Sequence, residues 1–278
     1  MIRTDNKQAM SPALTLIAVA LYVTGAAVAY RRFRAGRSAT HIGGAILILT
    51  AIALIAHAAS LFPALTRDGA LDLGFSNAVS LVAWVVIGLY VLTALVQPIE
   101  SLALIVLPIG AIATALHGLW PHAHTPIAVH SPLYAAHIVV SLLAYGLLSV
   151  AVAQSLMHSV QERALRHHAQ NTWMRALPPL ESMERLMFGM IWAGFALLTV
   201  TLASGLFFSE ELFGKPLRLT HHNVLSIIAW LVFAVLLAGR VFFGWRGRVA
   251  MRLALGGFTA LALAYFGAKF VLELMLGR

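Results

Sequence analysis

The sequence predicts an all-α protein, a polytopic membrane bundle of eight transmembrane helices that forms one integral membrane domain over residues 1–278. Hydrophobic residues make up 60% of the chain and charged residues only 10%, whereas a soluble domain is about 25% charged. The apolar residues also fall into eight stretches, each long enough for a helix to cross a bilayer. These spans are predicted at 12–30, 41–63, 76–96, 101–118, 132–157, 187–208, 222–243 and 249–275.

The basic residues predict how the spans are oriented. Twelve of the 19 Lys and Arg residues lie in the loops after the first, fifth and seventh spans. Because short cytoplasmic loops carry an excess of Lys and Arg, we expect these loops to face the cytoplasm and both termini to face the periplasmic side. The expected location is therefore the bacterial inner (plasma) membrane. The net charge of +9 follows from this topology and predicts no nucleic-acid partner.

The first half of the chain fits this order of spans. Arginines follow the first span rather than precede it, so we expect a retained span and not a signal peptide. The segment 64–75 after the second span is short and polar, as suits an outward loop. The inward turn before the fourth span contains Pro98 and Glu100. Both residues suit the first turn of a helix, where a missing N–H is harmless and a carboxylate meets the helix dipole.

The second half contains the two longer loops. The outward loop 117–131 is rich in His and Pro. The inward loop 158–186 is the longest and is rich in Arg, and Pro178 and Pro179 break it before the run into the sixth span. A turn at 244–248 separates the last two spans, and its Trp and Arg residues suit the inner interface.

Four histidines are the main functional candidates: His57 late in the second span, His117 at the end of the fourth, His137 one turn inside the fifth, and His222 opening the seventh. In the predicted topology all four lie at a similar depth under the outer leaflet. A single histidine of this kind is ordinarily a satisfied interfacial residue. Two neutral imidazoles that face each other across a helical bundle can hold haem iron. The sequence therefore predicts a haem site held by at least two of these four histidines.

Two of these histidines begin a polar face on their helices. His137, Ser141 and Tyr145 are spaced i, i+4, i+8, and so are His222, Ser226 and Trp230. Residues at this spacing lie on one helix face, one turn apart. We therefore include Ser141, Tyr145 and Trp230 among the candidate cofactor-binding residues. Core or lipid packing is the alternative interpretation for the two aromatic side chains.

Other functions have weaker signals. His122, His124 and His130 in the outward loop suggest a divalent-metal transporter or sensor, although no carboxylate lies nearby. The Arg-rich loop 158–186 suggests a non-catalytic membrane partner that binds no haem and docks a cytoplasmic protein, a haem-synthesis enzyme or an ion transporter. The chain has no Cys, no Ser–His–Asp arrangement, no Gly-rich phosphate loop and no paired carboxylates within the spans. A binding protein is therefore expected before an enzyme.

Several stretches together resemble the cytochrome c assembly superfamily (CcsA-like) and, within it, the HemX/YpjD-like inner-membrane branch. The resemblance is carried by residues 57–61, 137–145, 178–188, 225–230, 244–248 and 264–267. It implies an eight-span inner-membrane bundle in which histidines near the outer surface hold haem and present it to apocytochrome. His137 matches one of those outward histidines, and His57 matches the second-span histidine of the HemX/YpjD-like branch. Together with the predicted depth, the resemblance implies haem b with His57 and His137 as iron ligands, and His222 or His117 as reserve ligands.

The resemblance also shows where this chain differs. The larger assembly proteins carry a Trp-rich outward loop before the span that contains Trp230 here, whereas this chain has Thr220, His221, His222 and Asn223. HemX-like members are associated with the control of haem biosynthesis. The resemblance therefore implies an apocytochrome or a haem-pathway protein as partner, and haem handling related to cytochrome c assembly as function.

Overall fold

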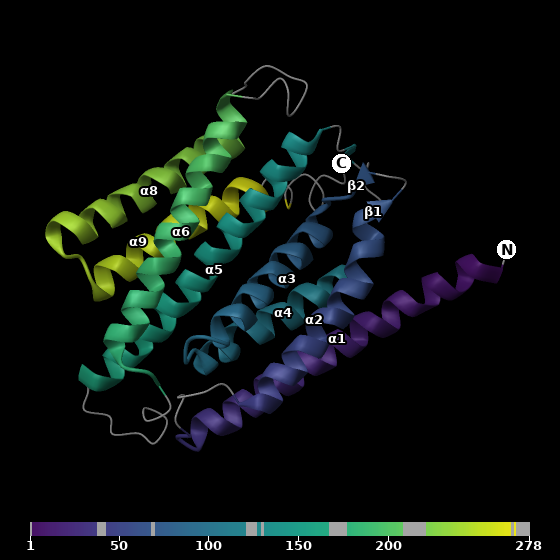
Figure 1. The fold of residues 1–278 in the computed structure, drawn as a ribbon, viewed down its shortest axis with the longest axis horizontal. Helices are drawn as coiled ribbons and strands as arrows, with labels where there is room; N and C mark the ends of the chain where they lie inside the picture. Colours follow the sequence, from purple (N-terminus) through teal and green to yellow (C-terminus); the bar gives the residue numbers. More distant parts are fainter. Residues whose placement is uncertain are drawn as a thin grey trace. The chain divides into compact units, whose positions relative to one another are not determined.

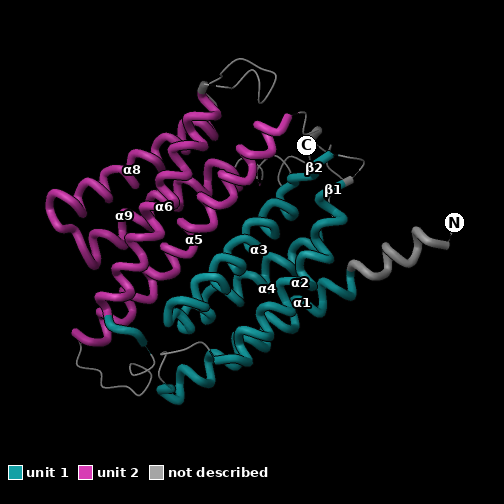
Figure 2. The backbone as a smooth tube through the Cα atoms, viewed as in Figure 1, with its two compact units in different colours: residues 1–128, 167–179 teal, residues 129–166, 180–278 magenta. Residues whose placement is uncertain are grey.

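The computed structural model describes residues 2–37, 43–67, 70–120, 127–128, 131–166, 177–207, 221–267 and 270. In these ranges eight helices are long and apolar enough to cross a membrane, which confirms the predicted all-α, polytopic class. The chain forms two compact units, unit 1 (residues 1–128 and 167–179) and unit 2 (residues 129–166 and 180–278), which Figure 2 shows in different colours. Each unit contains four of the eight spans. The single domain over the whole chain stays a prediction.

Unit 1 is built from α1 (Ile2–Arg34), α2 (Gly44–Leu65), α3 (Phe75–Ala94) and α4 (Ala103–Leu119), with a 3-10 turn, η1 (Glu100–Leu102), leading into α4 (Figure 1). Helix α1 packs against α2 and α4, and α3 packs against α4. The largest fully buried side chains of this bundle are Tyr22, Ile46, Leu61, Leu65, Ile87, Tyr90, Leu102 and Leu107. Its core is therefore mainly apolar, although polar residues such as His57, Ser80 and Thr114 are also fully buried in it.

Helix α1 ends where its sequence requires. Gly36 has a φ of +63°, the left-handed conformation that glycine adopts without strain. Its N–H donates to the carbonyl of Phe33, and the next N–H, of Arg37, donates to the carbonyl of Arg32. Three arginines in the last turn of α1 also suit the negative end of the helix dipole.

A small antiparallel sheet closes the other end of unit 1, where the sequence predicts only loops. Strand β1 (Thr66–Arg67) pairs with β2 (Ala70–Leu71), and β2 pairs with β3 (Ile127–Ala128). The strands have two residues each, too short for any alternation of polar and apolar residues to reveal them. The sheet joins the segment after α2 to a segment that follows α4.

Unit 2 is built from α5 (Pro132–Arg166), α6 (Leu180–Phe207), α8 (His221–Phe243) and α9 (Gly247–Ala262), and α9 continues into a π turn, η3 (Leu263–Gly267). Helix α5 packs against α6 and α9, and α8 packs against α6 and α9. A Cβ at Gly194 of α6 would lie 2.8 Å from Cγ of Leu148 on α5. The missing side chain thus lets these two helices approach closely, as small residues commonly do in membrane bundles.

The predicted boundaries of the inward loop 158–186 are wrong. Helix α5 continues to Arg166 and α6 begins at Leu180, directly after Pro178 and Pro179. Before its exposed last turn, α5 carries a stretch of polar yet buried residues, namely Gln154, Ser155, His158, Ser159 and Gln161. A drop in hydropathy marks where a helix leaves lipid, not where its hydrogen-bond ladder ends, so the loop was predicted too long.

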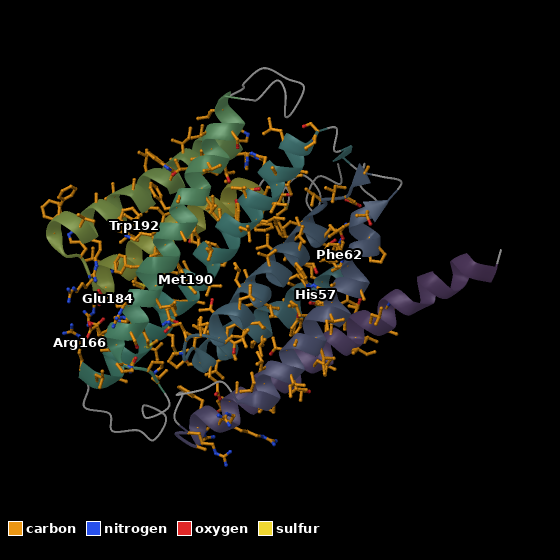
Figure 3. The ribbon with its side chains drawn as sticks, in the orientation of Figure 1. His57, Phe62, Arg166, Glu184, Met190 and Trp192 are labelled. Atoms are coloured by element: carbon orange, nitrogen blue, oxygen red, sulfur yellow. The ribbon has the colours of Figure 1, made fainter. Side chains whose placement is uncertain are left out.

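Ion pairs gather at one end of each unit. In unit 1, Arg32 at the end of α1 pairs with Glu100 at 2.6 Å, and the N–H of Gly43 donates to the same carboxylate at 3.0 Å. In unit 2, Glu184 at the start of α6 pairs with Arg240 near the end of α8. Figure 3 labels Glu184 together with Arg166, which pairs with Glu162 of α5. We refer to these regions as the arginine ends.

Candidate functional site

The structure pairs the four candidate histidines within the units. His57 of α2 and His117 of α4 belong to unit 1, and Thr114, which contacts His57, lies one turn before His117 on α4. His137 of α5 and His222 of α8 belong to unit 2. In both units the histidines lie toward the end of the bundle opposite the arginine end. The sequence-based pairing of His57 with His137 joins the two units and stays a prediction.

His57 is surrounded by hydroxyl groups in the core of unit 1, where Figure 3 labels it. Its side chain is completely buried. Nε2 lies 2.8 Å from the Ser80 hydroxyl, and Nδ1 lies 3.2 Å from the Tyr22 hydroxyl. The Thr114 hydroxyl lies within 3.3 Å of both ring nitrogens and donates its own hydrogen to the Gly110 carbonyl. Both nitrogens of His57 therefore have protein partners.

His117 lies on α4, one turn after Thr114. It is buried, and its Nδ1 lies 2.9 Å from Oδ1 of Asn77. The amide nitrogen of Asn77 donates to the main-chain carbonyl of Asp72, and the Asp72 carboxylate accepts the N–H of Gly74. His117 also forms a hydrogen bond with the backbone of Ser60. Like His57, His117 is engaged on more than one side.

His137 is half-buried, and a neighbouring hydroxyl sets its tautomer. Its Nδ1 lies 2.7 Å from the Ser204 hydroxyl of α6. That hydroxyl donates its only hydrogen to the Thr201 carbonyl at 3.0 Å. With that hydrogen bonded to Thr201, the Ser204 oxygen accepts from Nδ1–H, and the lone pair of the imidazole then lies on Nε2. Gly205, the next residue of α6, lies against the His137 ring, with its Cβ position 3.7 Å from Cε1.

His222 is exposed, and its tautomer is set by a main-chain carbonyl, a group that can only accept. Its Nδ1 lies 3.1 Å from the main-chain carbonyl of Ala264 in the π turn. A carbonyl only accepts, so Nδ1 carries the proton and the lone pair lies on Nε2. The ring of Tyr265 meets the imidazole edge-on, with centroids 6.3 Å apart. His137 and His222 thus present the same nitrogen as a potential ligand.

The other candidate residues support the bundle through hydrogen bonds. The Ser141 hydroxyl donates to carbonyls of its own helix, those of His137 and Ile138. The Tyr145 hydroxyl donates to the Leu261 carbonyl of α9 at 2.6 Å. Trp230 of α8 donates through Nε1 to the Thr199 hydroxyl of α6 and stacks on Phe195, with ring centroids 5.5 Å apart. Core packing, the alternative interpretation of the two aromatic residues, agrees with these contacts.

The two histidine pairs differ in how well they fit haem. A histidine that binds a metal through one nitrogen usually donates its other N–H to a fixed acceptor, which sets the tautomer and the ring orientation. His137 and His222 both show this arrangement. In unit 1, His117 also has an acceptor at Nδ1, the Asn77 amide oxygen, but it meets the backbone of Ser60 as well. For His57, an iron ligand would have to replace a hydrogen bond to a buried hydroxyl. The donor set of unit 2 therefore fits haem iron, and that of unit 1 does so less well.

The remaining candidates can be placed only in part. His122, His124 and His130 lie outside the described residues. Within the described ranges no three His, Asp or Glu side chains gather in a way that could hold a metal ion. Of the arginines predicted to dock a partner, Arg163 and Arg166 lie exposed on the last turns of α5, and Arg175 lies outside the described residues.

Comparison with known proteins identifies the family. The family model described as cytochrome C assembly protein matches residues 45–276. The chain belongs to this family. It is 33% identical to the inner membrane protein YpjD of Escherichia coli, over 82% of this chain and 87% of that protein. No solved structure matches it.

Two relatives of lower identity are named as cytochrome c biogenesis proteins. The chain is 29% identical to the cytochrome c biogenesis protein CcsA of Guillardia theta, over 66% of this chain and 64% of that protein. It is also 29% identical to CcsA of Prochlorococcus marinus, over 56% and 53% of the two chains. With its eight spans, the chain is a multi-pass protein of the bacterial inner membrane, related to cytochrome c biogenesis.

Sequence reasoning missed the partners that distinguish the histidines. Ser80, Thr114 and Ser204 are polar residues within apolar spans, and that isolation is a signal that could have identified them. The Ala264 carbonyl had no such signal, because every residue has a carbonyl. It lies in the π turn and faces Nδ1 of His222.

Proposed function

We propose that this protein binds haem b in unit 2, with His137 and His222 as iron ligands, and handles that haem for cytochrome c assembly. The main support is the hydrogen bond from Nδ1 of His222 to the Ala264 carbonyl, because it leaves Nε2 as the only nitrogen with a lone pair. Ser204 gives His137 the same tautomer. Both histidines lie toward the end of unit 2 opposite its arginine end, and Tyr145 on the helix of His137 contacts the segment that holds His222.

The chain's own groups would bind and orient the haem. The two neutral imidazoles would supply the iron ligands, and their Nδ1 hydrogen bonds would fix the ring planes and raise the basicity of Nε2. Bound haem supplies a one-electron centre, or is itself the cargo that is passed to an apocytochrome. The two CcsA relatives are named as cytochrome c biogenesis proteins, which supports delivery to apocytochrome as the role of this site.

The test is an absorption spectrum of the detergent-purified protein, before and after haem reconstitution and in oxidised and dithionite-reduced forms. We expect a Soret band and a sharp reduced α-band, and we expect His137→Ala to lose the α-band. His158→Ala is the matched control, because His158 is a buried histidine of the same helix near the arginine end. A wild-type spectrum without a Soret band after reconstitution would refute the proposal.

A second candidate function, docking of a cytoplasmic protein without haem, rests on the exposed arginines at the end of α5. Arg163 is exposed and forms no ion pair within the described part of the chain, whereas Arg166 pairs with Glu162. A partner recovered from the wild type and from His137→Ala, but not from Arg163→Gln, would favour this function over haem handling.

A further inference from the structure

Tyr145 lies two turns along α5 from His137 and is bound to a different helix. Its hydroxyl donates to the Leu261 carbonyl of α9 at 2.6 Å. Its ring meets Phe266 edge-on, with centroids 6.2 Å apart and an interplanar angle of 79°. Both contacts of Tyr145 therefore fall on the stretch where α9 passes into the π turn.

That stretch departs from α-helical geometry. Residues Leu263–Gly267 form the π turn, in which the main-chain hydrogen bonds reach one residue further than in an α-helix. Such turns are rare, and they occur frequently at functional sites. The Tyr145 hydroxyl and the Phe266 contact hold the two sides of this irregular segment, since Leu261 precedes the turn and Phe266 lies within it.

Two contacts of the His222 ring come from this π turn. The Ala264 carbonyl accepts from Nδ1 at 3.1 Å, and Tyr265 meets the imidazole edge-on. Tyr265 in turn packs edge-on against Phe266, with centroids 5.3 Å apart. A continuous path of contacts thus runs from Tyr145 through Phe266 and Tyr265 to His222.

We propose that Tyr145 and the π turn Leu263–Gly267 are the positioning elements of His222, fixing its ring orientation and its Nε2 lone pair. This inference rests on the proposed function, in which His222 is an iron ligand. Helix α5 then serves both ligands, since it carries His137 directly and sets His222 through Tyr145. The inference gives a physical reason for the His137–Ser141–Tyr145 spacing, which puts a ligand and the support of the other ligand on one helix face.

The test is Tyr145→Phe in the full chain, studied as the haem-reconstituted protein. Tyr90→Phe is the matched control, because Tyr90 is a fully buried tyrosine of a span whose hydroxyl has no hydrogen-bond partner among the described residues. For Tyr145→Phe we expect the haem dissociation constant to rise on the order of 10-fold, as for other residues that orient a metal ligand. We also expect changed g values in the electron paramagnetic resonance spectrum of the ferric protein at saturating haem. Tyr90→Phe should leave both quantities unchanged.

The g values separate positioning from a structural role. Loss of helix packing alone would lower the melting temperature but would leave the iron ligands at saturating haem as they are. Phe266→Leu, which removes the ring contacts at the same point, should shift the g values in the same direction and provides a second variant if Tyr145→Phe folds poorly. If the wild type binds haem and neither variant differs from Tyr90→Phe in the g values, the inference is wrong and the proposed function stands. If the wild type binds no haem, both are wrong.

Discussion

Units 1 and 2 share a plan but use their histidines differently. Each has four spans, an arginine end with an Arg–Glu pair, and two histidines toward the other end. In unit 1, His57 is fully buried among the hydroxyls of Tyr22, Ser80 and Thr114. In unit 2, His137 is half-buried and His222 is exposed, and each has a partner that accepts from its Nδ1.

The role of a histidine in a span depends on whether the hydrogen-bond partners of its ring nitrogens can both donate and accept or can only accept. A hydroxyl that is free to rotate can donate or accept, so Tyr22 and Ser80 satisfy either tautomer of a neutral His57. Such a network resembles the satisfied polar clusters that make a core specific. A carbonyl, or a hydroxyl already committed as a donor, accepts only, so it fixes the tautomer and directs one lone pair away from itself. The first arrangement suits structure and the second suits ligand binding.

The largest expected effect on stability is at His57. His57→Ala should lower the free energy of unfolding by about 3 kcal/mol, because it leaves a cavity and removes the shared partner of three buried hydroxyls. The measurement is unfolding of the purified protein in detergent. A loss near zero would show that the hydroxyl network contributes little to stability and would contradict a structural role for His57.

The second-largest loss of stability is expected when an ion pair at an arginine end is broken. Arg32→Gln leaves the buried Glu100 carboxylate without its cation and should cost about 2 kcal/mol. Arg240→Gln is the counterpart in unit 2, where Arg240 pairs with Glu184 and also lies over the Phe188 ring, 4.5 Å from its centroid. Similar losses in the two variants, measured by the same unfolding experiment, would support a shared plan. A loss confined to one unit would contradict it.

A smaller effect is expected at the serines that contact the histidines. Ser204→Ala removes the acceptor for Nδ1 of His137 and should weaken haem binding about 10-fold. Ser80→Ala is the matched change beside Nε2 of His57 and should leave haem affinity unchanged. Haem titration followed at the Soret band measures both. Equal effects of the two serines would contradict the assignment of ligand binding to unit 2.

The smallest effect is expected at the solvent-exposed pair on α6. Arg185 and Glu181 lie 3.7 Å apart, and their side chains are 76% and 90% exposed. Arg185→Gln should therefore change the free energy of unfolding by less than about 0.5 kcal/mol. A larger loss than in Arg32→Gln would show that burial does not distinguish these pairs.

The class of fold followed from the sequence because hydropathy reports directly on lipid exposure. All eight spans were predicted, most of them to within four residues at each end. The errors fall where polar residues continue a helix, as at His158 to Arg166 of α5, or where two-residue strands form at β1 and β2. Hydropathy carries no information about either feature.

The candidate site followed from the sequence only as far as the residue types. The depth of His57, His117, His137 and His222 could be inferred from their positions along the spans. Their partners depend on which helix faces meet, and sequence periodicity in an apolar helix gives little information about that. The Ala264 carbonyl shows the limit most clearly, since its role comes from a local change of helix type.

The most direct test of the comparison is a reduced-minus-oxidised difference spectrum of His57→Ala beside His222→Ala, each reconstituted with haem in detergent. We expect His57→Ala to keep the α-band of the wild type and His222→Ala to lose it. The opposite result is a band that survives in His222→Ala and disappears in a folded His57→Ala. It would place the haem ligand in unit 1 and contradict the proposal that haem binds in unit 2.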